Sequence, residues 1–504
     1  MGKERCPMAV PKEIREVERP VNTVVEARVN KNGIPRYIVR ERNGINYSNG
    51  HSRPKNGAVI GYIIDGKFVE KPSSGPIEPE ERSMTTWAVE RLILDLTKDV
   101  IDDLRMVYDE KDSEMGYSMA ILKVRNPDLK NSRMNRDYSE SILSEIFVNM
   151  PMSKNSVSEF LKTIGSAGLR MGEFIKARCS RLPAGAMLAV DGTLLTDNSI
   201  VNNLSAVSRK TRVRGNKEIS LIYAYDIERG EPVCFSVYPG NMLDSKAYAD
   251  FIRANNLQNA LLIGDKAFSK NAASKEFKER PDLHYLLPVR KDAKIIRELR
   301  LHDYNGVLKT EPGVSYCVVN DTEHNIHYYA FRDAERAAEE ERAYLEDRRK
   351  KGKSIDPIEI KRLRDTWGTI IYQSDMDMRP EDAYRAYSLR WTIELMFRLY
   401  KEIEEFDDTG VQSDASVIGE HFINFLSTIM TSRLMNRFLE VGLLEKMTFG
   451  EIMEILRRGL KFKDESGNWI FRAQTDKEKE VLRALDLMPK LPPKRGPGRP
   501  RKKP

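Results

Sequence analysis

Two short apolar segments, each running into an aspartate, constrain the fold of this 504-residue chain more than any other feature. The segment AMLAVDGTLL contains Asp191, NALLIGDKAF contains Asp265, and the helix-like DSKAYADFIRANN lies between them. This alternation predicts an α/β unit with a mixed sheet and acidic residues along one edge. A carboxylate on a buried strand is costly unless it is paired, hydrogen-bonded or bound to a cation. Each aspartate taken alone is also compatible with a simple strand cap or turn.

A third acid lies in the segment YSLRWTIELMFRLYKEIEEF, within a helix predicted from about residue 380 to 405. At 100° per residue, Tyr387, Arg390, Glu394 and Lys401 share one face of that helix, and apolar residues occupy the other. A solvated amphipathic helix with ordinary salt bridges has the same pattern. The functional alternative joins Glu394 to the two aspartates, because divalent cations such as Mg²⁺ prefer oxygen ligands.

The rest of the chain does not continue the alternation of strands and helices that this α/β unit shows. Short strands with the hairpin signals Asn32-Gly33 and Asp65-Gly66 come first, and a charged segment, AERAAEEERAYLEDRRKKGKS, predicts a solvated helix. We therefore predict a β-rich domain (1–80), a helical and possibly DNA-binding domain (81–180), an α/β domain (181–294 and 372–440), an insertion (295–371), C-terminal helices (441–490) and a basic tail (491–504).

The positive charge is concentrated at the C-terminal end. The net charge is +7, but the last fourteen residues, LPPKRGPGRPRKKP, hold six Lys and Arg and no acid. Such a tail suits a polyanion. Its Gly498-Arg499-Pro500 core, flanked by Arg495 and Arg501, is typical of an AT-hook, in which arginines enter the narrow minor groove of A·T-rich DNA. A basic tail that binds any polyanion is the alternative.

Composition argues against several classes of protein. Four cysteines lie far apart with no CxxC pair, which argues against a disulfide framework or a structural zinc site. His324 and His327 are interpreted as structural, because a spacing of three on a strand places them on opposite faces. No run of eighteen apolar residues is present, so we expect no membrane span and a cytoplasmic, nucleoid-associated protein.

The spacing Tyr387-x2-Arg390-x3-Glu394-x6-Lys401 resembles in full the YREK signature of insertion-sequence DDE transposases of family four. The sequences VDGT around Asp191 and IGDKAF around Asp265 precede it in the order of that family. The stretch from Tyr238 to Asp244 and the triplet 419–421 are also similar to the family, and the resemblance covers roughly residues 185–440. Where the family often has Asp-Arg-Gly, this chain has Asp-Lys-Ala at residues 265–267, which changes no expected metal ligand.

This resemblance implies an α/β multidomain chain whose catalytic domain has a ribonuclease-H-like mixed sheet with a β-containing insertion. It implies that Asp191, Asp265 and Glu394 hold two Mg²⁺ or Mn²⁺ ions and that Tyr387, Arg390 and Lys401 bind the terminal DNA phosphates. Trp367 is a candidate for stacking on a flipped base. The expected partners are double-stranded transposon ends and target DNA, bound by a homodimer that cleaves the ends and transfers strands.

Two other functions stay open at this point. The chain could be a domesticated DNA-binding protein that keeps the fold without catalysis, or a structure-selective nuclease on the same fold. The fate of the DNA distinguishes the three functions. A transposase cleaves the DNA and joins it to a target, a nuclease only cleaves it, and a binding protein leaves it intact.

Overall fold

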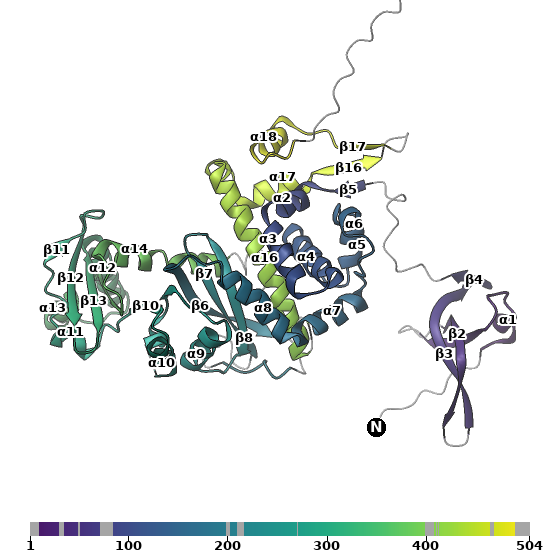
Figure 1. Ribbon diagram of the computed structural model, residues 1–504, viewed down its shortest axis with the longest axis horizontal. Helices are drawn as coiled ribbons and strands as arrows, with labels where there is room; N and C mark the ends of the chain where they lie inside the picture. The colour runs from purple at the N-terminus through teal and green to yellow at the C-terminus, as the bar shows by residue number, and fades with distance from the viewer. Residues whose placement is uncertain are drawn as a thin grey trace, which may run out of the picture. The chain divides into compact units, whose positions relative to one another are not determined.

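The computed structural model describes residues 10–29, 35–48, 51–70, 84–197, 202–208, 216–269, 271–398, 408–409, 411, 413–463 and 468–488. The chain divides into two compact units, Met1–Gly75 and Pro76–Pro504. Figure 1 shows their elements, coloured along the chain. Each unit is described below by itself.

The first unit is a small antiparallel sheet with strand order β1-β2-β3-β4. Its elements are α1 (Lys12–Arg15), β1 (Thr23–Val29), β2 (Pro35–Ser48), β3 (His51–Ile64) and β4 (Lys67–Glu70). Val25, Val39 and Ile63 form its core. Asp65 and Gly66 both have positive φ, 49° and 72°, so the predicted hairpin turn at this position is confirmed. The predicted turn at residues 32–33 lies outside the described residues.

The second unit is built on a large mixed sheet. Its central strands are β6 (Ala186–Asp197), β7 (Glu218–Asp226), β8 (Glu231–Pro239), β9 (Ala260–Ile263) and β10 (Leu283–Pro288), in the order β8-β7-β6-β9-β10. The strands β6, β7 and β8 are antiparallel to one another, and β6, β9 and β10 are parallel. This order and these directions are those of a ribonuclease-H-like sheet, as expected. The helix α9 (Asp244–Ala254) connects β8 to β9, followed by η2 (Lys266–Ser269) and α10 (Asn271–Glu279).

The insertion extends this sheet instead of forming a separate one. Its strands are β11 (Gly306–Val307), β12 (Val314–Asp321), β13 (Ile326–Asp333) and β14 (Thr369–Ser374), and β14 pairs antiparallel with β10. The helices of this region are α11 (Lys294–Glu298), α12 (Ala334–Lys350) and α13 (Pro357–Arg364). In α12 only Ala337 is buried, which confirms the predicted solvated helix.

A helical segment, arranged around one long helix, packs against the central strands near β8, away from the insertion at the β10 edge. It consists of α2 (Ala88–Leu96), α3 (Lys98–Val107), α4 (Glu110–Arg125), α5 (Met134–Ser139), α6 (Leu143–Ile146), α7 (Lys154–Ser166) and α8 (Gly168–Cys179). The helix α16 (Asp414–Glu440) runs through it and reaches β8, as Figure 1 shows. All residues from 421 to 432 are buried, so this middle part of α16 is enclosed on every side. Within the described residues, no helix is both long and apolar enough to span a bilayer.

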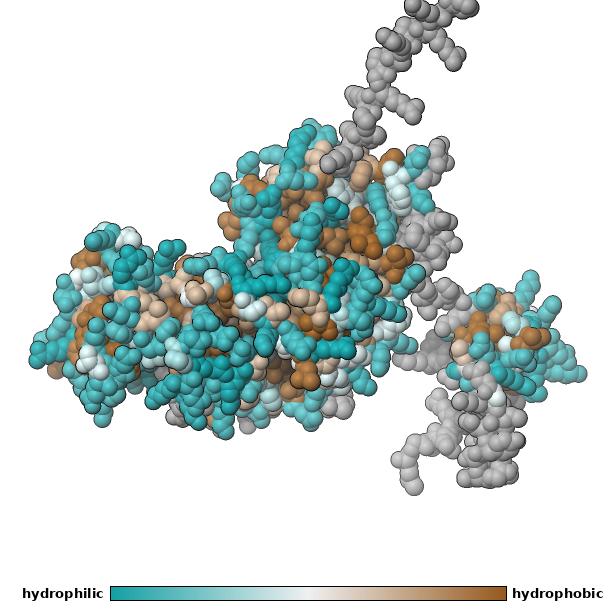
Figure 2. Space-filling view, in the orientation of Figure 1, coloured by the Kyte–Doolittle hydropathy of each residue, from teal (hydrophilic) through white to brown (hydrophobic). Residues whose placement is uncertain are grey.

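The segment after α16 contains strands that the sequence did not predict. It comprises η4 (Leu443–Glu445), α17 (Phe449–Arg457), β16 (Leu460–Lys463), β17 (Trp469–Phe471) and α18 (Asp476–Ala484). The strand β5 (Met84–Thr86) completes a sheet of order β17-β16-β5. Strands of three or four residues are too short for a clear alternation, so helices alone were predicted here. Figure 2 shows hydrophobic side chains at the surface in this region, where Met84, Phe462 and Phe471 are exposed.

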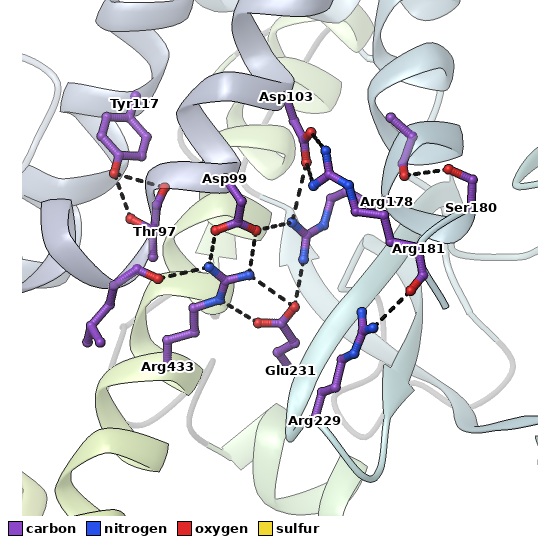
Figure 3. Close-up of polar contacts among 12 residues, drawn as sticks. Thr97, Asp99, Asp103, Tyr117, Arg178, Ser180, Arg181, Arg229, Glu231 and Arg433 are labelled. Atoms are coloured by element: carbon purple, nitrogen blue, oxygen red, sulfur yellow. Dashed lines mark hydrogen bonds and ion pairs between the residues drawn. The ribbon is translucent and has the colours of Figure 1, made fainter. Parts of the chain in front are cut away.

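A network of partly buried ion pairs joins the helical segment to the sheet and to α16 (Figure 3). Its members are Asp99, Asp103, Arg178, Arg181, Glu231 and Arg433. The Arg433 guanidinium donates to Asp99 Oδ2 at 2.8 Å and to Glu231 Oε2 at 2.6 Å. Burial lowers the pKa of Arg433, but the bonds to Asp99 and Glu231 outweigh it and raise this pKa. Because an unpaired buried charge is costly, the network fixes how these three elements meet.

His421 makes the stability of this core depend on pH. It is fully buried on α16, and burial together with the charge of Lys123 lowers its pKa to about 3. The unfolded chain takes up the proton near pH 6.5, so the unfolded state binds more protons between these two values. Stability is therefore lost as the pH falls below 6.5, by about 2 kcal/mol at pH 5 from this histidine. We expect His421→Gln to lose about 2 kcal/mol less unfolding free energy between pH 7 and pH 5 than the unsubstituted chain does, as measured by urea unfolding at both pH values.

The matched control for this experiment is His324→Gln. His324 is exposed in the turn between β12 and β13, and its hydrogen bond to Asp321 raises its pKa. Its replacement should not reduce the acid destabilisation. If His421→Gln loses as much stability between pH 7 and pH 5 as the unsubstituted chain, His421 is not the group that takes up the proton.

Candidate active site

Asp191 and Asp265 lie at equivalent positions on neighbouring parallel strands. The ladder between β6 and β9 ends with Ala189 opposite Ile263. Each aspartate follows its residue of that last pair by two positions. Asp191 does not end its strand, because β6 continues to Asp197 and pairs there with β7 and β15 (Asp408–Thr409). The two carboxylates therefore flank the point where β6 and β9 separate.

The helix expected across the YREK spacing is broken into two. The helix α14 (Pro380–Ser388) ends before a turn at residues 389–390, and α15 (Trp391–Arg398) begins after it. In the turn the Arg390 N–H donates to the Tyr387 carbonyl, and the Ile393 N–H to the Arg390 carbonyl, each three residues back. Such bonds tighten the chain and change its direction. The prediction of one continuous helix from about 380 to 405 is therefore wrong at residues 389–390, and Lys401 lies outside the described residues.

Arg390 stands between two of the three predicted acids. Its Nη1 lies 3.3 Å from Asp191 Oδ2, and its Nη2 lies 2.6 Å from Glu394 Oε1. Glu394 is in the first turn of α15, and its side chain is 56% exposed. The structure thus brings Glu394 to Asp191 through one shared guanidinium, although the two residues are about two hundred positions apart.

The charges of the three acids act on one another. Burial raises the pKa of Asp191, and the charges of Asp265 and Glu394 raise it further, against the Gly192 N–H and Arg390, which lower it. The Gly192 N–H donates to Asp191 Oδ1 at 2.8 Å. A raised carboxyl pKa next to two other acids marks a group whose ionised form lacks a full set of counter-charges. Such perturbed groups gather at functional sites, although structural ion pairs shift pKa values too.

The acids do not converge tightly in this arrangement. In the part of the chain that the structure describes, no group of three or more His, Cys, Asp or Glu side chains is placed to hold a metal ion. The donor set nevertheless consists of carboxylates, the ligands that Mg²⁺ and Mn²⁺ accept in proteins. Arg390 occupies the side of Asp191 that faces Glu394.

Aromatic residues pack around the site, and the sequence analysis did not identify Tyr248 or Tyr372 among them. Tyr387 stacks on Tyr372 of β14 with ring centroids 4.2 Å apart, and the Arg390 guanidinium lies 5.6 Å from the Tyr387 ring centroid. Tyr248 of α9 is buried against Phe268, with centroids 3.9 Å apart. Burial, and then the charge of Asp191, raise the pKa of the Tyr248 hydroxyl well above its ordinary value. A tyrosine at a core position of an amphipathic helix gives no signal in the sequence.

Of the other predicted site residues, only Trp367 lies within the described part of the chain. Trp367 precedes β14, is 7% exposed and packs against Tyr344 with centroids 5.6 Å apart. Its ring has no open face for a base in this structure, because the insertion's own helix covers it. Lys401, Arg495, Arg499 and Arg501 lie outside the described residues, so their roles stay predictions.

The fold and the site together define a ribonuclease-H-like domain with acidic residues just beyond the end of the ladder between two adjacent parallel strands. Residues 188–426, slightly less than half of the chain, match the family model described as the transposase DDE domain. This region is therefore similar to transposase catalytic domains, and it contains Asp191, Asp265 and Glu394.

Comparison with other proteins adds two similar solved structures. A piggyBac transposase synaptic complex with hairpin DNA has 11% sequence identity and a TM-score of 0.38, covering 75% of this chain and 82% of that one. The Mos1 transposase paired-end complex with the left transposon end has 12% identity and a TM-score of 0.15, covering 31% and 54%. No curated protein matches the sequence.

Proposed function

We propose that this protein is a DNA transposase of the YREK type, which cleaves transposon ends and joins them to target DNA. The observation that carries the proposal is that Arg390 contacts both Asp191 and Glu394 beside the point where β6 and β9 separate, and that the charges of Asp265 and Glu394 act on Asp191 there. The match of residues 188–426 to the transposase DDE domain supports it. Insertion-sequence family four is the finer assignment, and it rests on the four spaced residues of the signature.

In this proposal the three carboxylates hold the divalent ions, and neighbouring residues hold the DNA. Bound there, such ions would supply activation of an attacking oxygen and stabilisation of a leaving one in an in-line displacement. Arg390 exchanges its two carboxylate partners for a DNA phosphate, which its planar guanidinium can bind through two hydrogen bonds. Tyr387 lies beside Arg390 and orients it through the ring contact. Lys401 supplies a further positive charge to the phosphates.

If Arg390 exchanges carboxylate partners for a phosphate, its removal should raise the affinity for metal and lower the rate of DNA cleavage. In Arg390→Ala the carboxylates of Asp191 and Glu394 lose a competing cation, so we expect Mn²⁺ to bind the DNA-free protein about tenfold more tightly. Cleavage of DNA should fall, because a phosphate contact is lost. Isothermal titration with Mn²⁺ and a cleavage assay measure the two effects.

Arg385→Ala is the control, since Arg385 is exposed on α14 one turn before the break. It should change neither quantity. Unchanged or weaker Mn²⁺ binding by Arg390→Ala would mean that Arg390 does not compete for these carboxylates.

The basic tail is proposed as a separate DNA contact. Removing residues 491–504 takes away six positive charges, so binding to duplex DNA should weaken and its salt dependence should become less steep. Fluorescence anisotropy at several NaCl concentrations measures both. A salt slope equal to that of the full chain would exclude the tail as a phosphate contact.

Incubating the protein with DNA that carries the inverted repeats flanking its coding region, a target plasmid and Mg²⁺ tests the function itself. A transposase, acting as a homodimer on paired ends, gives ends joined to the target. Ends that are cut but never joined indicate a nuclease, and DNA that is shifted in a gel but intact indicates a binding protein without catalysis. Either result overturns the proposal.

A further inference from the structure

Two helices of the insertion, α12 and α13, form a hairpin between β13 and β14. The helix α12 begins directly after β13, where the Asp333 side chain accepts hydrogen bonds from its first turn. The helix α13 ends at Arg364, shortly before β14 begins at Thr369. The 17 residues of α12 rise about 1.5 Å each, so its last turn lies about 25 Å from β13. Figure 1 shows both helices at the end of the unit that the insertion forms.

Ion pairs hold the two helices of this hairpin to each other. Arg348 on α12 donates to both carboxylate oxygens of Glu359 on α13, at 2.8 and 2.7 Å. Arg364 on α13 lies 2.7 Å from Glu341 on α12. The Arg348 guanidinium also lies 5.1 Å from the ring centroid of Tyr344. Because a guanidinium that binds both oxygens of a carboxylate fixes their mutual geometry, these contacts set the orientation of α13 against α12.

The far end of the hairpin has a surplus of positive charge. Residues 347–364 contain eight Lys and Arg but only three Asp and Glu. Three of the eight cations are paired with carboxylates of the hairpin itself, namely Arg348, Lys351 and Arg364. The other five are exposed and form no ion pair with any residue that the structure describes; they are Arg349, Lys350, Lys353, Lys361 and Arg362. We call these five residues the basic tip.

Stabilisation of the two helices does not explain the whole basic tip. Cations in the last turn of a helix interact favourably with its carbonyl end, and this applies to the four members that lie on α12 and α13. The effect is confined to the last turn, whereas Lys353 lies in the connection between the helices. Like charges gathered without counter-charges also repel one another. A polyanion that binds the basic tip would remove this repulsion.

We propose that the basic tip binds the phosphate backbone of duplex DNA. The eight residues of α13 extend about 12 Å, and duplex DNA carries about one negative charge per 1.7 Å, so roughly seven phosphates lie within that length. Lysine and arginine bind phosphates without reading the base sequence. The proposal deepens the proposed function and rests on it, because DNA is taken as the substrate. It gives the insertion a DNA contact outside the carboxylate site and the basic tail, which adds affinity and no chemistry.

The test compares two variants of the full chain that lose the same charge. One variant carries three substitutions in the basic tip, Lys350→Gln, Lys353→Gln and Lys361→Gln. The control carries substitutions of three exposed lysines scattered over the same unit, Lys111→Gln, Lys130→Gln and Lys278→Gln. Binding is measured without divalent ions, so that cleavage cannot affect the result. The readout is anisotropy of a labelled random-sequence duplex across an NaCl series, and thermal unfolding checks that both variants are folded.

Three lost phosphate contacts should reduce the slope of log affinity against log salt by about 2 to 3 for the basic-tip variant alone. Its affinity at about 100 mM salt should fall roughly tenfold or more, while the control should bind like the unsubstituted chain. Equal loss in both variants would indicate a general effect of net charge and overturn the proposal, as would unchanged binding in both. Unchanged DNA binding with an altered oligomeric mass, measured by light scattering, would overturn it in favour of a contact between copies of the chain.

Failure of this inference can be told apart from failure of the proposed function. Strand joining by the unsubstituted chain, without an effect of the basic-tip substitutions on binding, rejects only the basic tip. A reduced salt slope in a chain that never cleaves or joins DNA rejects only the transposase.

Discussion

Asp265→Asn is expected to reduce metal-dependent DNA cleavage at least about a thousandfold, and Asp191→Asn and Glu394→Gln should do the same. Each substitution keeps the size of the side chain and removes the charge of one proposed metal ligand. Metal-assisted stabilisation of the transition state amounts to several kcal/mol, and each 1.4 kcal/mol corresponds to a factor of ten in rate. Single-turnover cleavage of an end-containing duplex in Mg²⁺ measures the effect, and DNA binding should persist.

Asp292→Asn and Glu279→Gln are the matched controls, because both side chains are exposed on the same unit. They should cleave DNA like the unsubstituted chain. A carboxylate variant that keeps a third or more of the rate loses its assigned role. Similar losses in the controls would point to a general effect of surface charge.

Gly165→Ala is expected to destabilise the second unit by about 3 kcal/mol. Gly165 on α7 faces α16 so closely that an added Cβ would lie 1.7 Å from the Ala415 carbonyl oxygen. From the other side, a Cβ on Gly419 would lie 2.0 Å from the Leu161 carbonyl oxygen. The two helices meet backbone to backbone, so a methyl group must push them apart and disturb the core on both sides. Urea unfolding measures the free-energy change.

Gly172→Ala is the matched control, because an added Cβ at this position on α8 meets nothing within 4 Å. Alanine there should stabilise the helix by up to about 1 kcal/mol. The two substitutions are chemically identical, so opposite signs isolate the helix contact. Gly165→Ala with unchanged or higher stability would contradict the close approach of α7 and α16.

The local pattern of the sequence predicted the two central strands that precede the aspartates. The apolar runs before Asp191 and Asp265 became β6 and β9, and the helix predicted between them is α9. These features depend on near neighbours in the chain. The insertion's strands were also predicted, but not their continuation of the central sheet, because the pairing of β14 with β10 joins residues far apart in sequence.

The site was predictable in its residue types and not in its geometry. Three acids and an arginine could be selected from their spacing, but the turn at residues 389–390 depends on packing. Tyr387 joins the core with Tyr372 on one side of the turn, and Ile393 joins the main core on the other. One straight helix cannot reach both cores. Tyr248 was missed for a related reason, since only the fold brings α9 beside Asp191.

Anomalous diffraction from crystals grown with Mn²⁺ and an end-containing duplex tests the central claim most directly. The account predicts two Mn²⁺ peaks about 3.5–4 Å apart, in contact with the carboxylates of Asp191, Asp265 and Glu394, and Arg390 turned toward a phosphate. Peaks absent from this position, or Glu394 still paired with Arg390 beside bound DNA, would contradict it.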